Sequence, residues 1–195
     1  MKRYFSSIIV VGIFIIVASC NDKKEEEPKV ESKINKAVPE EYLQIVRGLG
    51  MDTYYGDTPP DITGTYLMSP NILLRSNIVN DAPSNSPFVD YTVNFSNQNS
   101  TNFSISFTGT ASNEKEQSNS AVIAGSGNDF SVYGQSTSVV GSNSIVLGVI
   151  YSGTLENGKI KNMKRAIIVI DDTNAGPNLL KKGNARVFHD TDKSS

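Results

Sequence analysis

The chain has 195 residues, with 18 basic and 20 acidic side chains, one histidine, one cysteine and no tryptophan. A single histidine excludes a HExxH motif and any zinc site built from several imidazoles, and a single cysteine excludes an intrachain disulfide. The net charge of −2 argues against a nucleic-acid-binding protein, which usually presents a basic surface.

The first residues have the pattern of an export signal. Lys2 and Arg3 precede an apolar run from Ile8 to Val17, an order typical of the cationic and hydrophobic regions of a signal peptide. A run of about ten residues at about 1.5 Å each covers half of a hydrocarbon core of roughly 30 Å. We therefore expect the run to be removed and not to remain as a transmembrane helix.

The end of this run resembles the lipobox of bacterial lipoprotein precursors. In Val17-Ala18-Ser19-Cys20, an aliphatic residue and two small residues precede a cysteine. The resemblance implies a signal peptide over residues 1–19 and a mature chain that begins at Cys20, whose acyl chains, such as palmitate, hold the protein on a membrane. The alternative is an ordinary secretory signal with a chance cysteine.

Residues 20–38 are predicted to form a disordered, charged tether. Five acidic and five basic side chains cancel there, and little apolar surface is available to offset the entropy of ordering. Asn21 follows the cysteine in place of aspartate, and by resemblance to the sorting rule of many Gram-negative bacteria this implies the outer membrane, facing the cell surface or the periplasm. The acids also resemble a surface-export signal, and a plain solvated linker explains them equally well.

Residues 39–195 are predicted to form one β-domain with a short helix at its start. Pro39, the acidic pair Glu40-Glu41 and Gly48 mark the beginning and end of this helix. Alternation of apolar and polar residues then predicts about 8–10 strands. They are expected at residues 62–68, 72–76, 89–95, 103–108, 121–124, 130–135, 145–154, 166–171 and 185–189. Residues 96–102 fit a hairpin loop, and Asn157-Gly158 carries the signal of a tight turn.

This pattern predicts an all-β fold, either an antiparallel, lipocalin-like β-barrel or a β-sandwich. A barrel is favoured because it leaves no strand edges to protect. Eight large residues at alternating positions are expected to share one packed interior: Val93, Phe95, Phe103, Ile105, Phe107, Phe130, Val132 and Val149. Gly64, Gly134 and Gly148 leave open the alternative of an interior with room for a ligand.

Three segments invite a chemical interpretation, and each has a simpler one. His189 next to Asp190 suggests part of a serine triad, but no Gly-x-Ser-x-Gly motif is present and a solvated histidine is favoured. Residues 125–129 suggest a phosphate loop, yet a glycine turn between strands suffices. Asp171-Asp172 opens a segment like a calcium loop in which the glycine falls one position early, so a polar turn is favoured. We therefore predict no catalytic residue, cofactor or metal site.

Basic residues gather near the end of the chain, between Lys159 and Arg186. Removal of Lys2 and Arg3 with the signal peptide takes the net charge from −2 to −4, and no aromatic residues suited to base stacking alternate with these cations. We interpret them as side chains that keep the outer faces of the last strands soluble, and we predict no nucleic-acid partner.

Several segments resemble a group of uncharacterised β-rich lipoproteins of Gram-negative bacteria. They are residues 59–66, Ser69-Pro70, residues 127–133, Ser152-Gly153 and residues 185–190. The resemblance covers most of residues 48–190 and implies a common fold but no activity; the acid-glycine tail of that group is missing after Asp190. We expect a monomeric, membrane-anchored, non-catalytic domain that binds a protein or glycan through loops at residues 96–102 and 111–120. The alternatives are a lipocalin-like carrier of an apolar ligand and a hydrolase.

Overall fold

The computed structural model describes residues 30–112 and 114–191. The predicted signal peptide, Cys20 and the tether as far as residue 29 lie outside the described residues. Two helices precede the strands: α1 (Val30–Ala37) and α2 (Glu40–Gly48). The strands are β1 (Asp57–Thr58), β2 (Gly64–Met68), β3 (Asn71–Ser76), β4 (Pro87–Phe88), β5 (Tyr91–Asn99), β6 (Ser104–Ala111), β7 (Glu114–Ser126), β8 (Asp129–Val140), β9 (Asn143–Glu156), β10 (Lys159–Asp171) and β11 (Ala185–Asp190).

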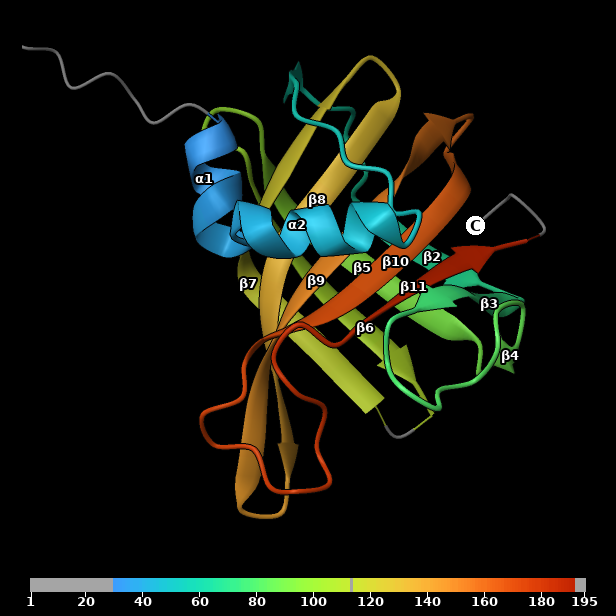
Figure 1. Ribbon diagram of the computed structural model, residues 1–195. Helices are drawn as coiled ribbons and strands as arrows, with labels where there is room; N and C mark the ends of the chain where they lie inside the picture. The colour runs from blue at the N-terminus through green and yellow to red at the C-terminus, as the bar shows by residue number, and fades with distance from the viewer. Residues whose placement is uncertain (1–29, 113, 192–195) are drawn as a thin grey trace, which may run out of the picture.

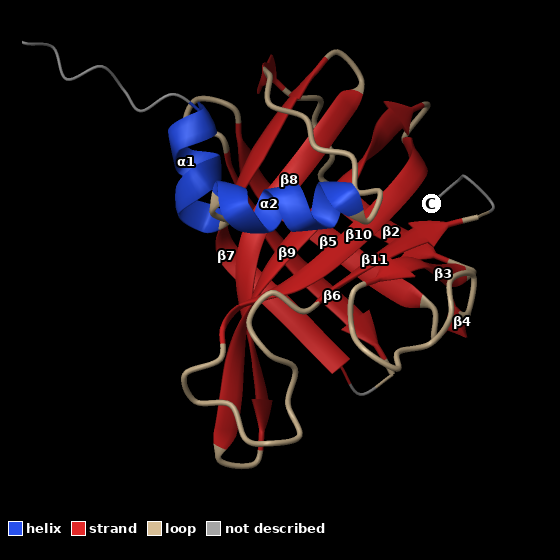
Figure 2. Ribbon diagram, in the orientation of Figure 1, coloured by secondary structure: helices blue, strands red, loops and turns tan. Residues whose placement is uncertain are grey.

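The strands form one curled antiparallel sheet, as Figures 1 and 2 show. Its order is β2-β5-β6-β7-β8-β9-β10-β11-β3-β4, and β1 joins β7 in parallel. The predicted all-β fold with a short N-terminal helix is therefore confirmed, with the strands in a half-barrel and not in two packed sheets.

The connection between β2 and β3 explains the curl. These strands lie near opposite ends of the strand order, yet only Ser69 and Pro70 separate them in the chain. Three virtual Cα–Cα bonds of 3.8 Å reach at most about 11 Å, so the sheet must bend until its two ends lie close together.

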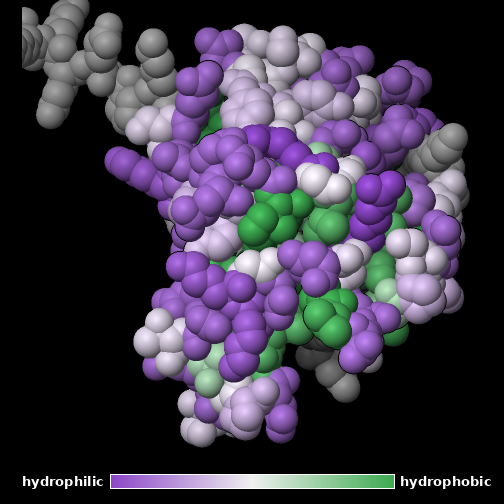
Figure 3. Space-filling view, in the orientation of Figure 1, coloured by the Kyte–Doolittle hydropathy of each residue, from purple (hydrophilic) through white to green (hydrophobic). Residues whose placement is uncertain are grey.

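The curl gives the sheet an inner and an outer apolar face. Phe95, Phe107, Phe130 and Tyr151 belong to the inner cluster of buried residues. The outer cluster lies under the two helices, where α1 contacts β7 and β8, and α2 contacts β10 and β11. On the side with the helices, hydrophilic side chains cover most of the surface and leave hydrophobic patches at and below α2 (Figure 3).

The predicted tether is wrong from residue 30 onwards, because α1 is a packed helix. Val30, Ile34 and Val38 are buried in the outer cluster. Their spacing of four residues places them on one side of a helix. This apolar stripe indicates a packed helix, whereas the balance of charges alone suggested a disordered tether.

The predicted packed interior is confirmed with one exception. Seven of the eight expected residues belong to the inner cluster, but Phe103 packs at the outer cluster instead. It has a φ of 58° just before β6 begins, and this left-handed turn directs the ring towards α1, where Lys33 Nζ lies 5.6 Å from the ring centroid. Gly134 leaves no room inside, because a Cβ there would lie 2.6 Å from Cε1 of Phe107.

Candidate functional site

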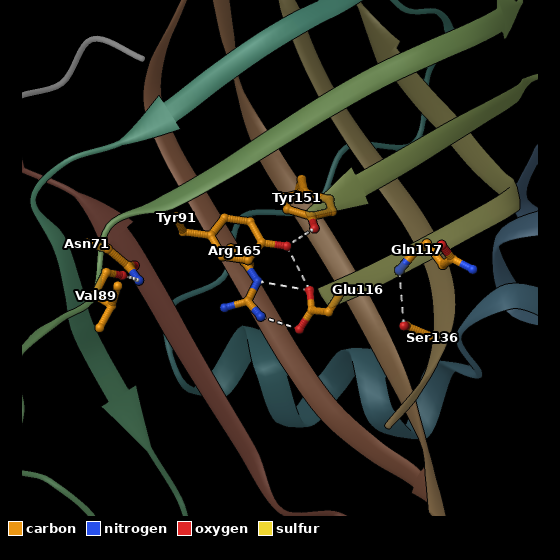
Figure 4. Close-up of polar contacts among 8 residues, drawn as sticks. All are labelled: Asn71, Val89, Tyr91, Glu116, Gln117, Ser136, Tyr151 and Arg165. Atoms are coloured by element: carbon orange, nitrogen blue, oxygen red, sulfur yellow. Dashed lines mark hydrogen bonds and ion pairs between the residues drawn. The ribbon is translucent and has the colours of Figure 1, made fainter. Parts of the chain in front are cut away.

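Four polar side chains meet inside the curled sheet (Figure 4). They are Tyr91 of β5, Glu116 of β7, Tyr151 of β9 and Arg165 of β10. Arg165 Nε donates a hydrogen bond of 3.2 Å to Glu116 Oε2, and Nη2 is ion-paired with Oε1. The Tyr91 hydroxyl donates to the same Oε2 at 2.8 Å and lies 2.6 Å from the Tyr151 hydroxyl.

The direction of each proton in this cluster follows from the acceptor at its centre. The ionised carboxylate of Glu116 can only accept, so the Tyr91 hydroxyl donates to it and accepts a hydrogen bond from Tyr151. Burial raises the pKa of both tyrosines well above the usual range, which keeps them protonated. Burial also opposes the charge of Arg165, but the facing carboxylate outweighs it and raises the arginine pKa.

Arg165 is held in place by aromatic rings as well as by the ion pair. Its guanidinium carbon lies 4.0 Å from the centroid of the Tyr91 ring and 5.3 Å from that of Phe188. The residue is only 3% exposed. A buried charge persists only when paired and hydrogen-bonded in this way, so the cluster is a fixed element of the interior.

A cavity of about 290 Å³ lies beside this cluster. Its lining comes from β3, β4, β5, β10 and β11, from the last residue of β6, and from Val89 and Ser112, which lie just outside the strands. Phe88, Tyr91 and Phe188 supply aromatic walls, and both charged residues in the lining are arginines, Arg165 and Arg186.

Arg186 repeats the arrangement of Arg165 at the cavity wall. Its Nε and Nη2 donate to the two carboxylate oxygens of Asp81 at 2.8 and 2.6 Å, and the hydrogen bond from Arg186 is the largest of the effects that lower the pKa of Asp81. Its guanidinium carbon lies 5.7 Å from the centroid of the Phe88 ring. Within the described chain, Nη1 of each arginine makes no hydrogen bond, and Figure 4 shows the third nitrogen of Arg165 directed away from Glu116.

A second cleft, of about 610 Å³, adjoins the cavity and shares Ile167 and Arg186 with it. It lies beside the β8–β9 hairpin, which Figure 1 shows projecting from the sheet next to the loop before β11. Val139 and Val140 at the hairpin tip are 65% and 57% exposed. The cleft therefore has an apolar outer edge.

The structure does not bring His189 and Asp190 into one site. They are consecutive in β11, so their side chains point to opposite faces of the sheet. His189 pairs across the sheet with Lys164, and its pKa is lowered first by burial and then by that lysine. The predicted solvated histidine is wrong in part, because Nε2 is buried and has no hydrogen-bond partner within residues 30–112 and 114–191.

The other two candidate segments are turns with internal partners. Gly127 has a φ of 62° between β7 and β8, which confirms the glycine turn. Asp171 accepts from the backbone N–H of Thr173, and Asp172 accepts from that of Lys182. In the part of the chain that the structure describes, no three His, Cys, Asp or Glu side chains are grouped to hold a metal.

The expected binding loops are mostly strand. β5 extends to Asn99, and β7 begins at Glu114, so only short turns remain between the strands in residues 96–102 and in the described part of residues 111–120.

The prediction that the late basic residues are solvated is wrong for Arg165. Strand alternation places it in one row with Met163 and Ile167, and an arginine in an apolar row is the signal that could have identified it.

Comparison with protein-family models, with curated proteins and with solved structures found no match. Among the described residues, neither helix has the length and apolar content needed to span a membrane.

Proposed function

We propose that this protein is an exported lipoprotein, held on the outer membrane by lipidated Cys20, whose β-domain binds a small organic ligand without catalysing a reaction. The observation that carries the proposal is the cavity of about 290 Å³ beside Tyr91, Arg165 and Arg186. Aromatic walls with a few fixed polar groups are the usual composition of a ligand pocket.

Because the interior is packed, we place the ligand in the pocket between the two ends of the sheet and not in a central, lipocalin-like cavity. Tyr91, Tyr151, Phe95, Phe107 and Phe130 are among the largest fully buried side chains. Two of them, Phe95 and Phe107, pack edge-on against the Tyr151 ring with centroid distances of 5.3 and 5.2 Å. A ligand that enters the cavity does not need to displace these rings.

The anchor is tested by labelling cells with a clickable palmitate analogue. We expect the wild-type protein to carry label and to sediment with membranes, because the several acyl chains of a processed lipoprotein make anchoring durable. Cys20→Ser should lose both properties, whereas the control Ser19→Gly keeps a small residue before the cysteine and should retain them. Label that persists in Cys20→Ser would contradict the anchor.

The pocket is tested by a ligand screen on the mature protein, read by its thermal transition. Ala111 lines the cavity and is partly buried against the inner cluster, so the larger side chain of Ala111→Leu should project into the space and abolish stabilisation by a bound ligand. Thr110 is the preceding, exposed residue of β6, and Thr110→Leu is the matched control. Ligands that stabilise both variants equally would contradict binding in this cavity.

A second candidate function is the binding of a protein or glycan at the β8–β9 hairpin. The exposed Val139 and Val140 favour it, because neighbouring exposed apolar residues at a projecting tip suit a contact surface. Val139→Ser with Val140→Ser should then abolish capture of the partner while ligand stabilisation at the cavity persists.

A further inference from the structure

We infer that the cavity between β5 and β11 selects a small organic carboxylate, whose two oxygens accept hydrogen bonds from Nη1 of Arg165 and Nη1 of Arg186. This inference rests on the proposed function and names the chemical class of its ligand.

The register of β10 and β11 places the two arginines within reach of one ligand group. Arg165 pairs with Phe188, and Ile167 pairs with Arg186, so the two arginines are diagonal neighbours on the inner face. Residues in diagonal positions lie about 7–8 Å apart, with their Cβ atoms somewhat closer, a separation that long side chains can bridge. A carboxylate between them is contacted from two sides.

Each arginine is already oriented by its own carboxylate and aromatic ring. Glu116 and Asp81 occupy Nε and Nη2, and the Tyr91 and Phe88 rings lie against the guanidinium groups. A donor that is held before binding loses little entropy when the ligand arrives. The remaining nitrogens are therefore preorganised.

The electrostatics of the cavity wall favour a single negative charge. Glu116 and Asp81 are not among the residues that line this cavity, whereas both arginines are. The wall is thus positive, although each ion pair is neutral as a whole. Two free donor groups match the two oxygens of a carboxylate, and a phosphate dianion would retain oxygens and charge without partners in an aromatic pocket.

The rest of the lining requires an apolar body attached to the carboxylate. Phe88 and Phe188 meet edge-on with a centroid distance of 5.1 Å. Ile167, which also lines the cavity, lies directly opposite Arg186 and two residues after Arg165 on β10. A ring-bearing carboxylate fits this combination of walls and donors.

The test titrates benzoate, and the isosteric neutral benzamide, into the mature protein, with NMR detection of the arginine Nε–H resonances. We expect benzoate to shift the signals of Arg165 and Arg186 and to bind at least about tenfold more tightly than benzamide. Ala111→Leu should abolish benzoate binding, and Thr110→Leu should leave it unchanged. Arg186→Lys keeps a cation for Asp81 but removes Nη1, and should weaken benzoate about tenfold with little effect on benzamide.

Equal affinity for benzoate and benzamide would overturn the carboxylate assignment. The carboxylate assignment would also be overturned if benzoate did not bind while other compounds stabilised the wild-type protein but not Ala111→Leu. In that case the proposed pocket would stand, with a different class of ligand. If neither probe binds and no compound in the ligand screen distinguishes the wild-type protein from Ala111→Leu, the proposed pocket fails together with its ligand class.

Discussion

Removal of the charge of Glu116 tests whether the buried cluster is a fixed element of the interior. In Glu116→Gln the amide oxygen can still accept from Tyr91, but Arg165, which is 3% exposed, keeps a charge without its counter-ion. Breaking a buried ion pair in this way costs about 3–5 kcal/mol, a large part of a typical unfolding free energy of about 5–15 kcal/mol.

The assay is urea unfolding followed by circular dichroism, in which the midpoint should fall while the slope stays constant. The matched control is Glu40→Gln, because Glu40 pairs with Arg47 at the surface, where the two side chains are 50% and 31% exposed. An exposed pair contributes at most about 1 kcal/mol.

A double-mutant cycle separates the pair from its surroundings. Arg165→Met should also destabilise, and Glu116→Gln combined with Arg165→Met should lose about 2 kcal/mol less than the sum of the single changes, because no unpaired charge remains. If Glu116→Gln cost no more than Glu40→Gln, the buried pair would not stabilise the fold and the reasoning would be refuted.

Three further predictions concern α1, the packed interior and His189. Ile34→Ala should lower the free energy of unfolding by about 2–5 kcal/mol, since Ile34 is 1% exposed, whereas deletion of residues 21–29, which belong to the predicted tether, should leave the urea midpoint unchanged. Gly134→Ala should cost about 1–3 kcal/mol through its contact with Phe107, while the control Gly48→Ala meets no atom within 4 Å and should be neutral or slightly stabilising in thermal unfolding. The lowered pKa of His189 means that the unfolded state binds more protons near the unfolded value of about 6.5, so stability is complete above that pH and is lost as the pH falls through it. His189→Gln should remove this loss between pH 7.5 and 5.5 in urea titrations, and an unchanged pH dependence would contradict the assigned direction.

Local patterns in the sequence predict most of the strands because each depends on neighbouring residues. The alternation of Val93 and Phe95 with polar residues identifies β5, and Asn157-Gly158 predicts the turn in which both residues have positive φ, 52° and 76°. Phe103 departs from the pattern because its backbone turns just before the strand begins, and alternation alone does not register such a turn.

The candidate site depends on pairings over long distances along the chain, which one sequence does not reveal. Glu116 and Arg165 are 49 residues apart, and they meet only because β7 and β10 bring their inner faces together across the curl. Alternation places Tyr91 and Tyr151 in predicted strands and says nothing about their hydroxyls, which acquire a role only beside that pair. Strand alternation can identify Arg165 as an arginine in an apolar row, but it cannot identify Glu116 as its partner.

The early start of α1 has a consequence for how the domain stands on a membrane. With Val30 already in the helix, about ten residues separate it from Cys20, and at full extension they reach at most about 36 Å. Figure 1 shows α1 and the β8–β9 hairpin at opposite ends of the molecule. If Cys20 carries the lipid, the α1 end stays within this distance of the bilayer, while the hairpin and the adjoining cleft, at the far end of the domain, can meet molecules that approach from the aqueous side.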